Sequence, residues 1–178
     1  MTKDRLNISW YMKRTRTNQI IKNFLIDHIK KYNNEEYLLL DSTTHMKYLN
    51  YEDLLELAIG VTSKDINITL GEGEDFDNGW DAKMYSVRTH SKGLNYSASV
   101  NAYNKEKLAV CIFEPIQEKF YFFAIENCKD MKYVSIPFEL NGDPKRVSKG
   151  ISNEWWSYEK ESLADMVSSF SLIPLRKS

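Results

Sequence analysis

Apolar residues recur at helical spacing in the first third of the chain, and they alternate with polar residues in much of the remainder. Thr17 or Asn18 is a typical cap for a first helix, which we expect to end near the Asn33-Asn34 pair. Asn50 caps a second helix over residues 51–59, which stops at Gly60. Between the two helices, residues 37–40 form a short apolar run that is typical of a buried strand.

The segment that follows reads as a hairpin. Residues 65–70 alternate polar and apolar side chains, which predicts a strand with one buried face. Asn78-Gly79 is a strong signal for a tight turn, and a second strand starts from Trp80. The glycines of this segment are therefore explained by the turn.

The rest of the chain is rich in strands and ends in a helix. Strands are predicted over residues 109–116, 120–126 and 133–138, residues 96–103 form a strand or a short helix, and residues 159–170 form the closing helix. This order of elements predicts an α/β (α+β) fold, in which a central mixed β-sheet is flanked by helices.

Composition places the chain in the class of ordinary globular domains. Its 178 residues suffice for one domain with a full hydrophobic core. Cys111 and Cys128 lack the spacing of a metal site or a disulfide framework. The charged start of the sequence is unlike a secretory signal, and no apolar run approaches the roughly 20 residues that span a bilayer. We therefore expect a soluble, cytoplasmic protein with no membrane partner.

Charge is sorted along the chain, although the net charge is only -1. Residues 1–34 carry eight Lys or Arg against two Asp or Glu, whereas residues 35–81 carry two against twelve. Fourteen basic and eleven acidic residues follow. A basic first part suits phosphate groups, and an acidic middle suits a hard cation such as Mg²⁺. Basic helices and acidic loops that simply alternate on a solvated surface would give the same counts.

Asp81 and Lys83 are the residues that folding alone does not explain. In a strand, residues two apart project from the same face, so these side chains converge on one point. Asp65, at the start of the other hairpin strand, is placed to join them. Two carboxylates bind divalent cations, and a lysine beside them orients a water or stabilises charge on a phosphate.

Asp65 followed by Asp81-Ala82-Lys83 resembles the D...(D/E)xK core of the PD-(D/E)xK nuclease superfamily, which includes many type II restriction enzymes. The similarity extends over about residues 50–137: a helix before the hairpin, a polar basic loop at residues 88–93, and two further strands. It implies a restriction-endonuclease-like fold and Mg²⁺-dependent hydrolysis of DNA, with Mn²⁺ as a substitute ion. Asp65 and Asp81 would be metal ligands, and Lys83 would position the attacking water.

The sequence departs from the family pattern in places. Lys64 stands where the family often has proline, and Asp75 or Asp77 is an alternative first carboxylate. The resemblance also implies a glutamate from the preceding helix, for which Glu56 is the candidate and Glu52 the second choice.

The predicted partner is double-stranded DNA. The basic candidates for contacting it lie in the first helical part (residues 1–34) and in the loop after the catalytic strand, and they are Lys13, Arg14, Arg16, Arg88, His90 and Lys92. We interpret residues 1–178 as one nuclease domain, with a catalytic core at about 50–137 and a C-terminal helix at about 159–170. A homodimer is expected, because two symmetric subunits most simply cut two strands.

A different class of protein remains open. In a non-enzymatic interaction or DNA-binding protein, for instance a phage or plasmid factor, Asp81 and Lys83 would form a structural ion pair.

Overall fold

The computed structural model describes residues 3–32, 49–63, 76, 79–90, 95–128, 130–148 and 150–170. Its elements, in chain order, are α1 (Lys3–Tyr32), α3 (Tyr51–Thr62), β1 (Asp81–Ser86), β2 (Arg88–His90), β3 (Asn95–Asn101), β4 (Leu108–Glu114), β5 (Lys119–Ile125), β6 (Tyr133–Phe138), β7 (Val147–Ser148), β8 (Ile151–Ser152), the 3₁₀ helix η2 (Glu154–Tyr158), β9 (Glu159–Lys160) and α4 (Leu163–Phe170).

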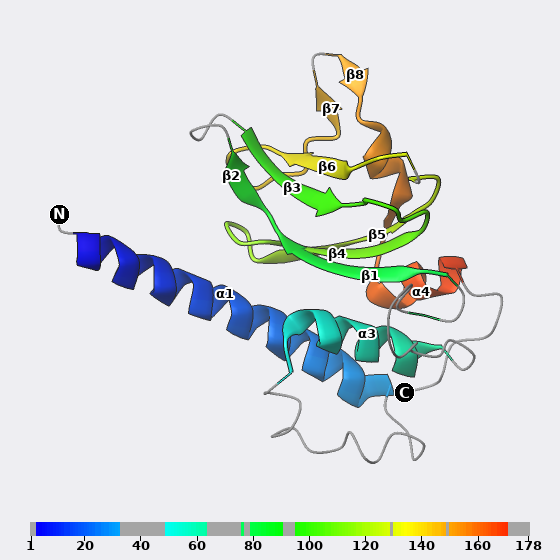
Figure 1. Ribbon diagram of the computed structural model, residues 1–178, viewed down its shortest axis with the longest axis horizontal. Coiled ribbons are helices and arrows are strands. Elements are labelled where there is room, and N and C mark those ends of the chain that lie inside the picture. The colour runs from blue at the N-terminus through cyan, green and yellow to red at the C-terminus, as the bar shows by residue number, and fades with distance from the viewer. Residues whose placement is uncertain are drawn as a thin grey trace.

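The strands form two main sheets and a small hairpin (Figure 1). The larger sheet has the order β1-β4-β5-β9, in which β1 is parallel to β4 and the other pairs are antiparallel. The second sheet has the antiparallel order β2-β3-β6. The described helices α1, α3 and α4 lie along one face of the larger sheet, and the second sheet covers the other face (Figure 1). The α+β class and the mixed sheet are confirmed, whereas the second sheet is a layer that the sequence did not predict.

A first core lies between the helices and the larger sheet. Ile21, Leu25 and Ile29 of α1 are buried, and their spacing of four places them on one side of the helix. They belong to the same apolar cluster as Ala82 and Met84 of β1. Burying a side chain of this size contributes about 1.5–3 kcal/mol. Packing of this stripe therefore holds the second half of α1 against the fold.

A second core lies between the two sheets. β4 of the larger sheet is buried along its whole length, because apolar clusters cover both of its faces. Trp156 of η2 closes this core, with its ring edge-on to Tyr121, Phe123 and Phe138 at centroid distances of 5.3–5.8 Å. The guanidinium group of Arg146 lies 4.6 Å from the centre of the same indole. Edge-on packing of this kind is favourable for aromatic rings.

A polar link joins α1 to α3. The Thr62 hydroxyl donates to the carbonyl oxygen of Ala58, so it accepts the hydrogen bond from Nε2 of His28 over 2.7 Å. His28 also stacks on Tyr32, with ring centroids 4.7 Å apart. Burial, and secondarily the charge of Lys31, lowers the pKa of His28 to about 4. The imidazole is therefore neutral at neutral pH, and it donates from Nε2.

The start of α3 agrees with the sequence prediction. The Asn50 side chain accepts a hydrogen bond of 2.8 Å from the backbone N–H of Asp53, which is the expected N-cap geometry. The helix does not stop at Gly60 but continues to Thr62. Val61 is fully buried in the first core. Its packing stabilises residues 60–62 in the helix and outweighs the preference of glycine for helix ends.

Two other helix boundaries were predicted wrongly. The first helix begins at Lys3 and not at Thr17 or Asn18, and the segment before Thr17 contains neither glycine nor proline to interrupt it. The closing helix begins at Leu163, because Glu159 and Lys160 pair with β5 as β9. The Ser162 hydroxyl then accepts from the N–H of Asp165 at 3.1 Å and caps α4.

The strand predictions are largely confirmed. β4, β5 and β6 lie within one or two residues of the predicted bounds, and the ambiguous segment 96–103 is strand β3. The predicted strand at 37–40 and the first hairpin strand at 65–70 lie outside the described residues.

Candidate functional site

β1 carries the Asp81-Ala82-Lys83 tripeptide along the edge of the parallel β1–β4 pair, where Asp81 lies opposite Leu108 and Lys83 opposite Val110. Ala82 and Met84 belong to the core under the helices. Because successive side chains of a strand alternate between faces, Asp81 and Lys83 project to the other side, toward the second sheet. The predicted convergence of these two residues on one face therefore has the strand geometry that it requires.

Asp81 is held in a buried position at the start of β1. Only 3% of the residue is exposed. Its carboxylate forms an ion pair with Lys105, with 3.4 Å between Oδ1 and Nζ, and its backbone N–H donates to the carbonyl oxygen of Lys107 at 3.1 Å. Lys105 comes from the turn between β3 and β4 and is itself partly exposed. A buried carboxylate thus lies beside an ammonium group that reaches solvent.

The thiol of Cys128 lies close enough to Asp81 and Glu106 to be affected by their charges. Cys128 is buried in the core between the sheets, and its thiol donates to the carbonyl oxygen of Glu106 at 3.1 Å. Burial is the main cause that raises the pKa of Cys128, and the charges of Glu106 and Asp81 raise it further. Asp81 and Glu106 therefore both place negative charge near Cys128, and Lys105 balances the charge of Asp81.

Tyr85 ties the same face of β1 to the second sheet. Its hydroxyl oxygen accepts a hydrogen bond of 3.2 Å from the backbone N–H of Asn101, the last residue of β3. Lys105 follows four residues later and reaches Asp81. The end of β3 and the turn after it therefore lie beside Asp81.

The other predicted metal ligands are not brought to Asp81 within the described residues. Asp65, Asp75 and Asp77 lie outside those residues. Glu56 belongs to α3, which packs on the Ala82 side of β1, so it lies across the sheet from the Asp81 carboxylate. In the described part of the chain, no three His, Cys, Asp or Glu side chains gather closely enough to hold a metal ion.

The predicted DNA contacts fall on two elements. Arg88 and His90 form strand β2, which corrects the predicted loop at this point, and Lys92 lies beyond the described residues. Lys13, Arg14 and Arg16 are in α1. Arg16 is exposed and pairs with Glu118 over 2.9 Å.

A cleft of about 500 Å³ lies at the carboxyl end of β1, between α1 and the start of α3. Arg88 lines it together with Thr17, Asn18 and Glu52. The cleft therefore brings the middle of α1 close to the first residue of β2. Asp81 is at the opposite end of β1, so the cleft and the Asp81 site are separate places.

A second hollow lies on the outer face of the β2-β3-β6 sheet. It measures about 410 Å³, and we call it the serine groove because Ser97, Ser99 and Ser135 line it, together with His90 and Lys145. Sequence reasoning missed it, and it also missed Lys105. A signal for the groove was present, because residues 95–101 alternate polar and apolar side chains, which marks a strand with one polar face.

The fold and this site define an α+β protein in which buried Asp81 pairs with partly exposed Lys105 at the edge of a mixed sheet. Comparison with known proteins adds no family: no family model matches the chain, and neither a curated protein nor a solved structure matches it significantly. Among the described residues, no helix is both long enough and apolar enough to cross a membrane.

Proposed function

We propose that this protein is a Mg²⁺-dependent endonuclease of the PD-(D/E)xK type that hydrolyses phosphodiester bonds in double-stranded DNA. The observation that supports the proposal is the position of Asp81 and Lys83 on one face of β1, with a buried carboxylate and an ammonium two residues apart. Charged residues are rarely buried unless they are paired, and a metal ion would be a second partner for this carboxylate beside Lys105.

The donor set is compatible with Mg²⁺. This ion is usually held by one or two carboxylates, with substrate phosphate and water as further ligands. Asp81 supplies one carboxylate, whose partner in this structure is the ammonium group of Lys105. Asp65 is the proposed second ligand. When bound, the ion would polarise a phosphoryl oxygen and lower the pKa of a coordinated water.

The side chains of the protein would supply the remaining roles, which are orientation of the water, charge balance and contact with the DNA. Lys83, which is only partly buried, would orient the attacking water and stabilise negative charge on the phosphate. Lys105 balances the charge of Asp81 while no metal is present. Arg16, Arg88 and His90 would contact the DNA backbone, and a homodimer would present two such sites to the two strands.

Plasmid cleavage tests the proposal. Supercoiled DNA is incubated with the purified protein and Mg²⁺ or Mn²⁺, and with EDTA as the blank. We expect nicked and linear DNA only with metal, and a loss of about 100-fold or more in rate for Asp81→Asn and Lys83→Ala. Asp27→Asn and Lys30→Ala, which alter exposed residues of α1, are the matched controls. Intact DNA under every metal condition, or undiminished cleavage by both site variants, refutes the nuclease.

One observation favours the second candidate, a non-enzymatic DNA-binding or interaction protein. Asp81 already has a cationic partner, which is Lys105 and not Lys83 as the sequence suggested. In this case the pair would serve stability alone. A double-mutant cycle with Asp81→Asn and Lys105→Met would then show coupling in urea unfolding, while the wild type would leave DNA intact.

A further inference from the structure

The outer face of the β2-β3-β6 sheet is polar in every row of the strand register. Side chains that lie directly opposite in antiparallel strands share a face. Ser97 therefore projects with Arg88 on one side and Pro137 on the other, and Ser99 projects with Ser135. The next row along β3 pairs Asn101 with Tyr133. The inner face of the same strands carries Tyr96, Ala98 and Val100, which are buried in the core between the sheets.

Basic side chains lie at one end of this face. Arg88 is exposed, and His90 and Lys145 line the serine groove. Nε2 of His90 lies 3.3 Å from the carbonyl oxygen of Ser97, so this ring is anchored to the floor of the groove. Glu139 is the acidic residue that lines the groove. Arg88 and Lys145 against Glu139 give this end a positive balance.

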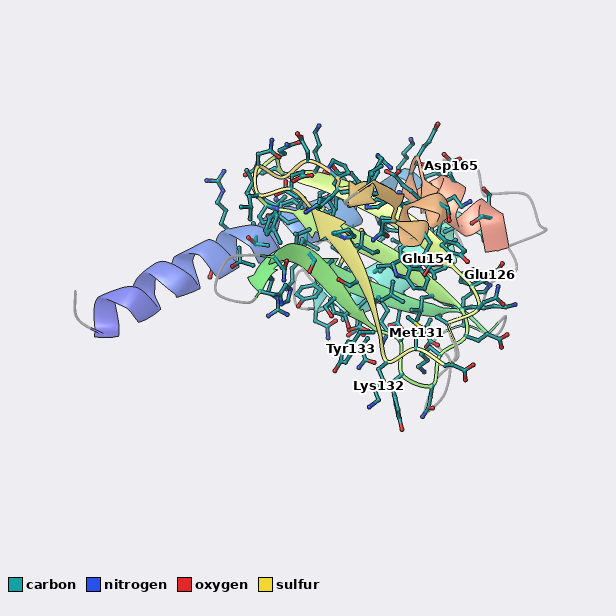
Figure 2. The ribbon with its side chains drawn as sticks, turned by 90° about the horizontal axis from the view of Figure 1, so that it is seen from above. Glu126, Met131, Lys132, Tyr133, Glu154 and Asp165 are labelled. Carbon is teal, nitrogen blue, oxygen red and sulfur yellow. The ribbon has the colours of Figure 1, made fainter. Side chains whose placement is uncertain are left out.

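An aromatic ring lies at the other end. Tyr133, the first residue of β6, is 59% exposed. Figure 2 looks onto this sheet and shows Tyr133 beside Met131 and Lys132 at the rim. Acidic Glu126, Glu154 and Asp165 are on the η2 and α4 side of β6 in the same view. An anionic chain that contacts Tyr133 would therefore run along β3 toward β2 and not toward α4.

We propose that the outer face of the β2-β3-β6 sheet binds an unpaired strand of nucleic acid across the serine groove, with phosphates at Arg88, His90 and Lys145 and a base stacked on Tyr133. An exposed polar face alone would not indicate this, because antiparallel sheets often turn one polar face to water. The hollow, the basic end and the exposed ring together match the needs of a single strand, which offers phosphates and unstacked bases at once. A duplex keeps its bases stacked, so it cannot use the ring.

The dimensions agree with a short segment. β3 advances by about 20 Å over its six steps from Asn95 to Asn101, at roughly 3.3 Å per residue. The end of β3 then leads to Lys105, the partner of Asp81. The choice of nucleic acid as the ligand rests on the proposed function, although the groove lies on the outer face of the second sheet and the Asp81 site on its inner side.

Binding is measured in EDTA, so that cleavage plays no part. A fluorescent 12-nucleotide single strand and the duplex of the same sequence are titrated with full-length protein, and fluorescence anisotropy is recorded at several salt concentrations. We expect the single strand to bind at least about 10-fold more tightly than the duplex. Tyr133→Ala should lose on the order of 10- to 100-fold in affinity, while Tyr133→Phe, which keeps the ring, should bind like the wild type.

The cations are tested through the salt dependence. Lys145→Ala should weaken binding and reduce the slope of log affinity against log salt by about 0.7, the value for one phosphate contact on a single strand. Lys30→Ala, which removes an exposed cation from α1, should leave the slope unchanged. Tighter binding of the duplex, or Tyr133→Ala and Lys145→Ala proteins that bind like the wild type, overturns the proposal.

The two proposals fail separately. If Asp81→Asn binds the single strand normally and the wild type cuts no DNA, single-strand binding by the groove is supported and the proposed nuclease activity is refuted. If plasmid is cut in an Asp81-dependent manner while the single strand is not bound, the nuclease activity is supported and single-strand binding by the groove is refuted.

Discussion

Replacing Glu114 by glutamine is expected to lower the free energy of unfolding by about 2–4 kcal/mol. Glu114 ends β4 and is completely buried, yet its carboxylate is well bonded. Oε1 accepts from the Tyr96 hydroxyl at 2.7 Å and from the N–H of Ile116 at 2.8 Å. Oε2 accepts from the N–H of Gln117 at 2.7 Å. The three donors join β3, β4 and the turn that leads to β5.

The magnitude follows from what an amide can and cannot do in that position. With its oxygen in place of Oε1, the glutamine keeps two acceptor contacts, but its NH₂ group then faces the N–H of Gln117. One hydrogen bond to a charged acceptor is lost, which costs about 1.5–3 kcal/mol, and the partly buried N–H of Gln117 loses its partner, which costs up to about 1–3 kcal/mol. Partial relaxation of the turn keeps the total below the sum of the two.

The assay is urea unfolding followed by tryptophan fluorescence, with thermal unfolding as a second measurement. For a chain of 178 residues, the expected loss corresponds to a fall in Tm of roughly 5–15 °C. Glu118→Gln is the matched control, because Glu118 is exposed and pairs only with the exposed Arg16 in the contacts described above. It should change stability by no more than about 0.5 kcal/mol. A Glu114→Gln protein as stable as that control would refute the reasoning.

Three further predictions concern backbone, pH and thiols. Gly142→Ala should lower the free energy of unfolding in urea by at least about 1–2 kcal/mol, because the φ of Gly142 is +96° and a Cβ would lie 2.8 Å from the buried carboxylate of Glu114. Gly150 has a φ of +79° with open space around it, so Gly150→Ala should cost only the backbone strain. His28 has a folded pKa of about 4 against 6.5 unfolded, so its stabilisation is complete above pH 6.5 and is lost, by up to about 3 kcal/mol, as the pH falls to about 4. In His28→Gln, the free energy of unfolding should depend less on pH between pH 6.5 and about 4. An unchanged pH dependence in this variant would contradict the low pKa of His28. Burial raises the pKa of both Cys111 and Cys128, so a thiol reagent at pH 8 should modify neither in the folded protein and both in urea.

Local signals explain the parts of the fold that the sequence predicts well. Asn50 caps α3 through a bond to a residue three positions on, so the evidence for that helix is contained in four consecutive residues. β4 and β5 are continuous apolar runs, and a run of this length with turn residues after it indicates a buried strand. For the same reason, the shared face of Asp81 and Lys83 could be predicted from their spacing alone.

The second sheet could not be predicted in this way, because its pairing is non-local. β3 pairs with β6, and the paired Ser99 and Ser135 are far apart in the sequence. Lys105 likewise reaches Asp81 from a turn that follows two intervening strands. Alternation in β3 shows that one face is polar, but it does not show which other strands share that face or whether the face is hollow.

β3 connects the proposed site to the proposed groove. Its outer side chains line the groove, its last residue donates to the hydroxyl of Tyr85 on β1, and the turn after it supplies the ammonium that pairs with Asp81. The groove lies on the outer face of the second sheet, whereas Asp81 and Lys83 face its inner side, so the end of β3 and the turn after it are what the two places share. The same turn also carries Lys105, whose ammonium group lies beside the Asp81 carboxylate. A metal ion that bound this carboxylate would have to bind next to the ammonium group or displace it.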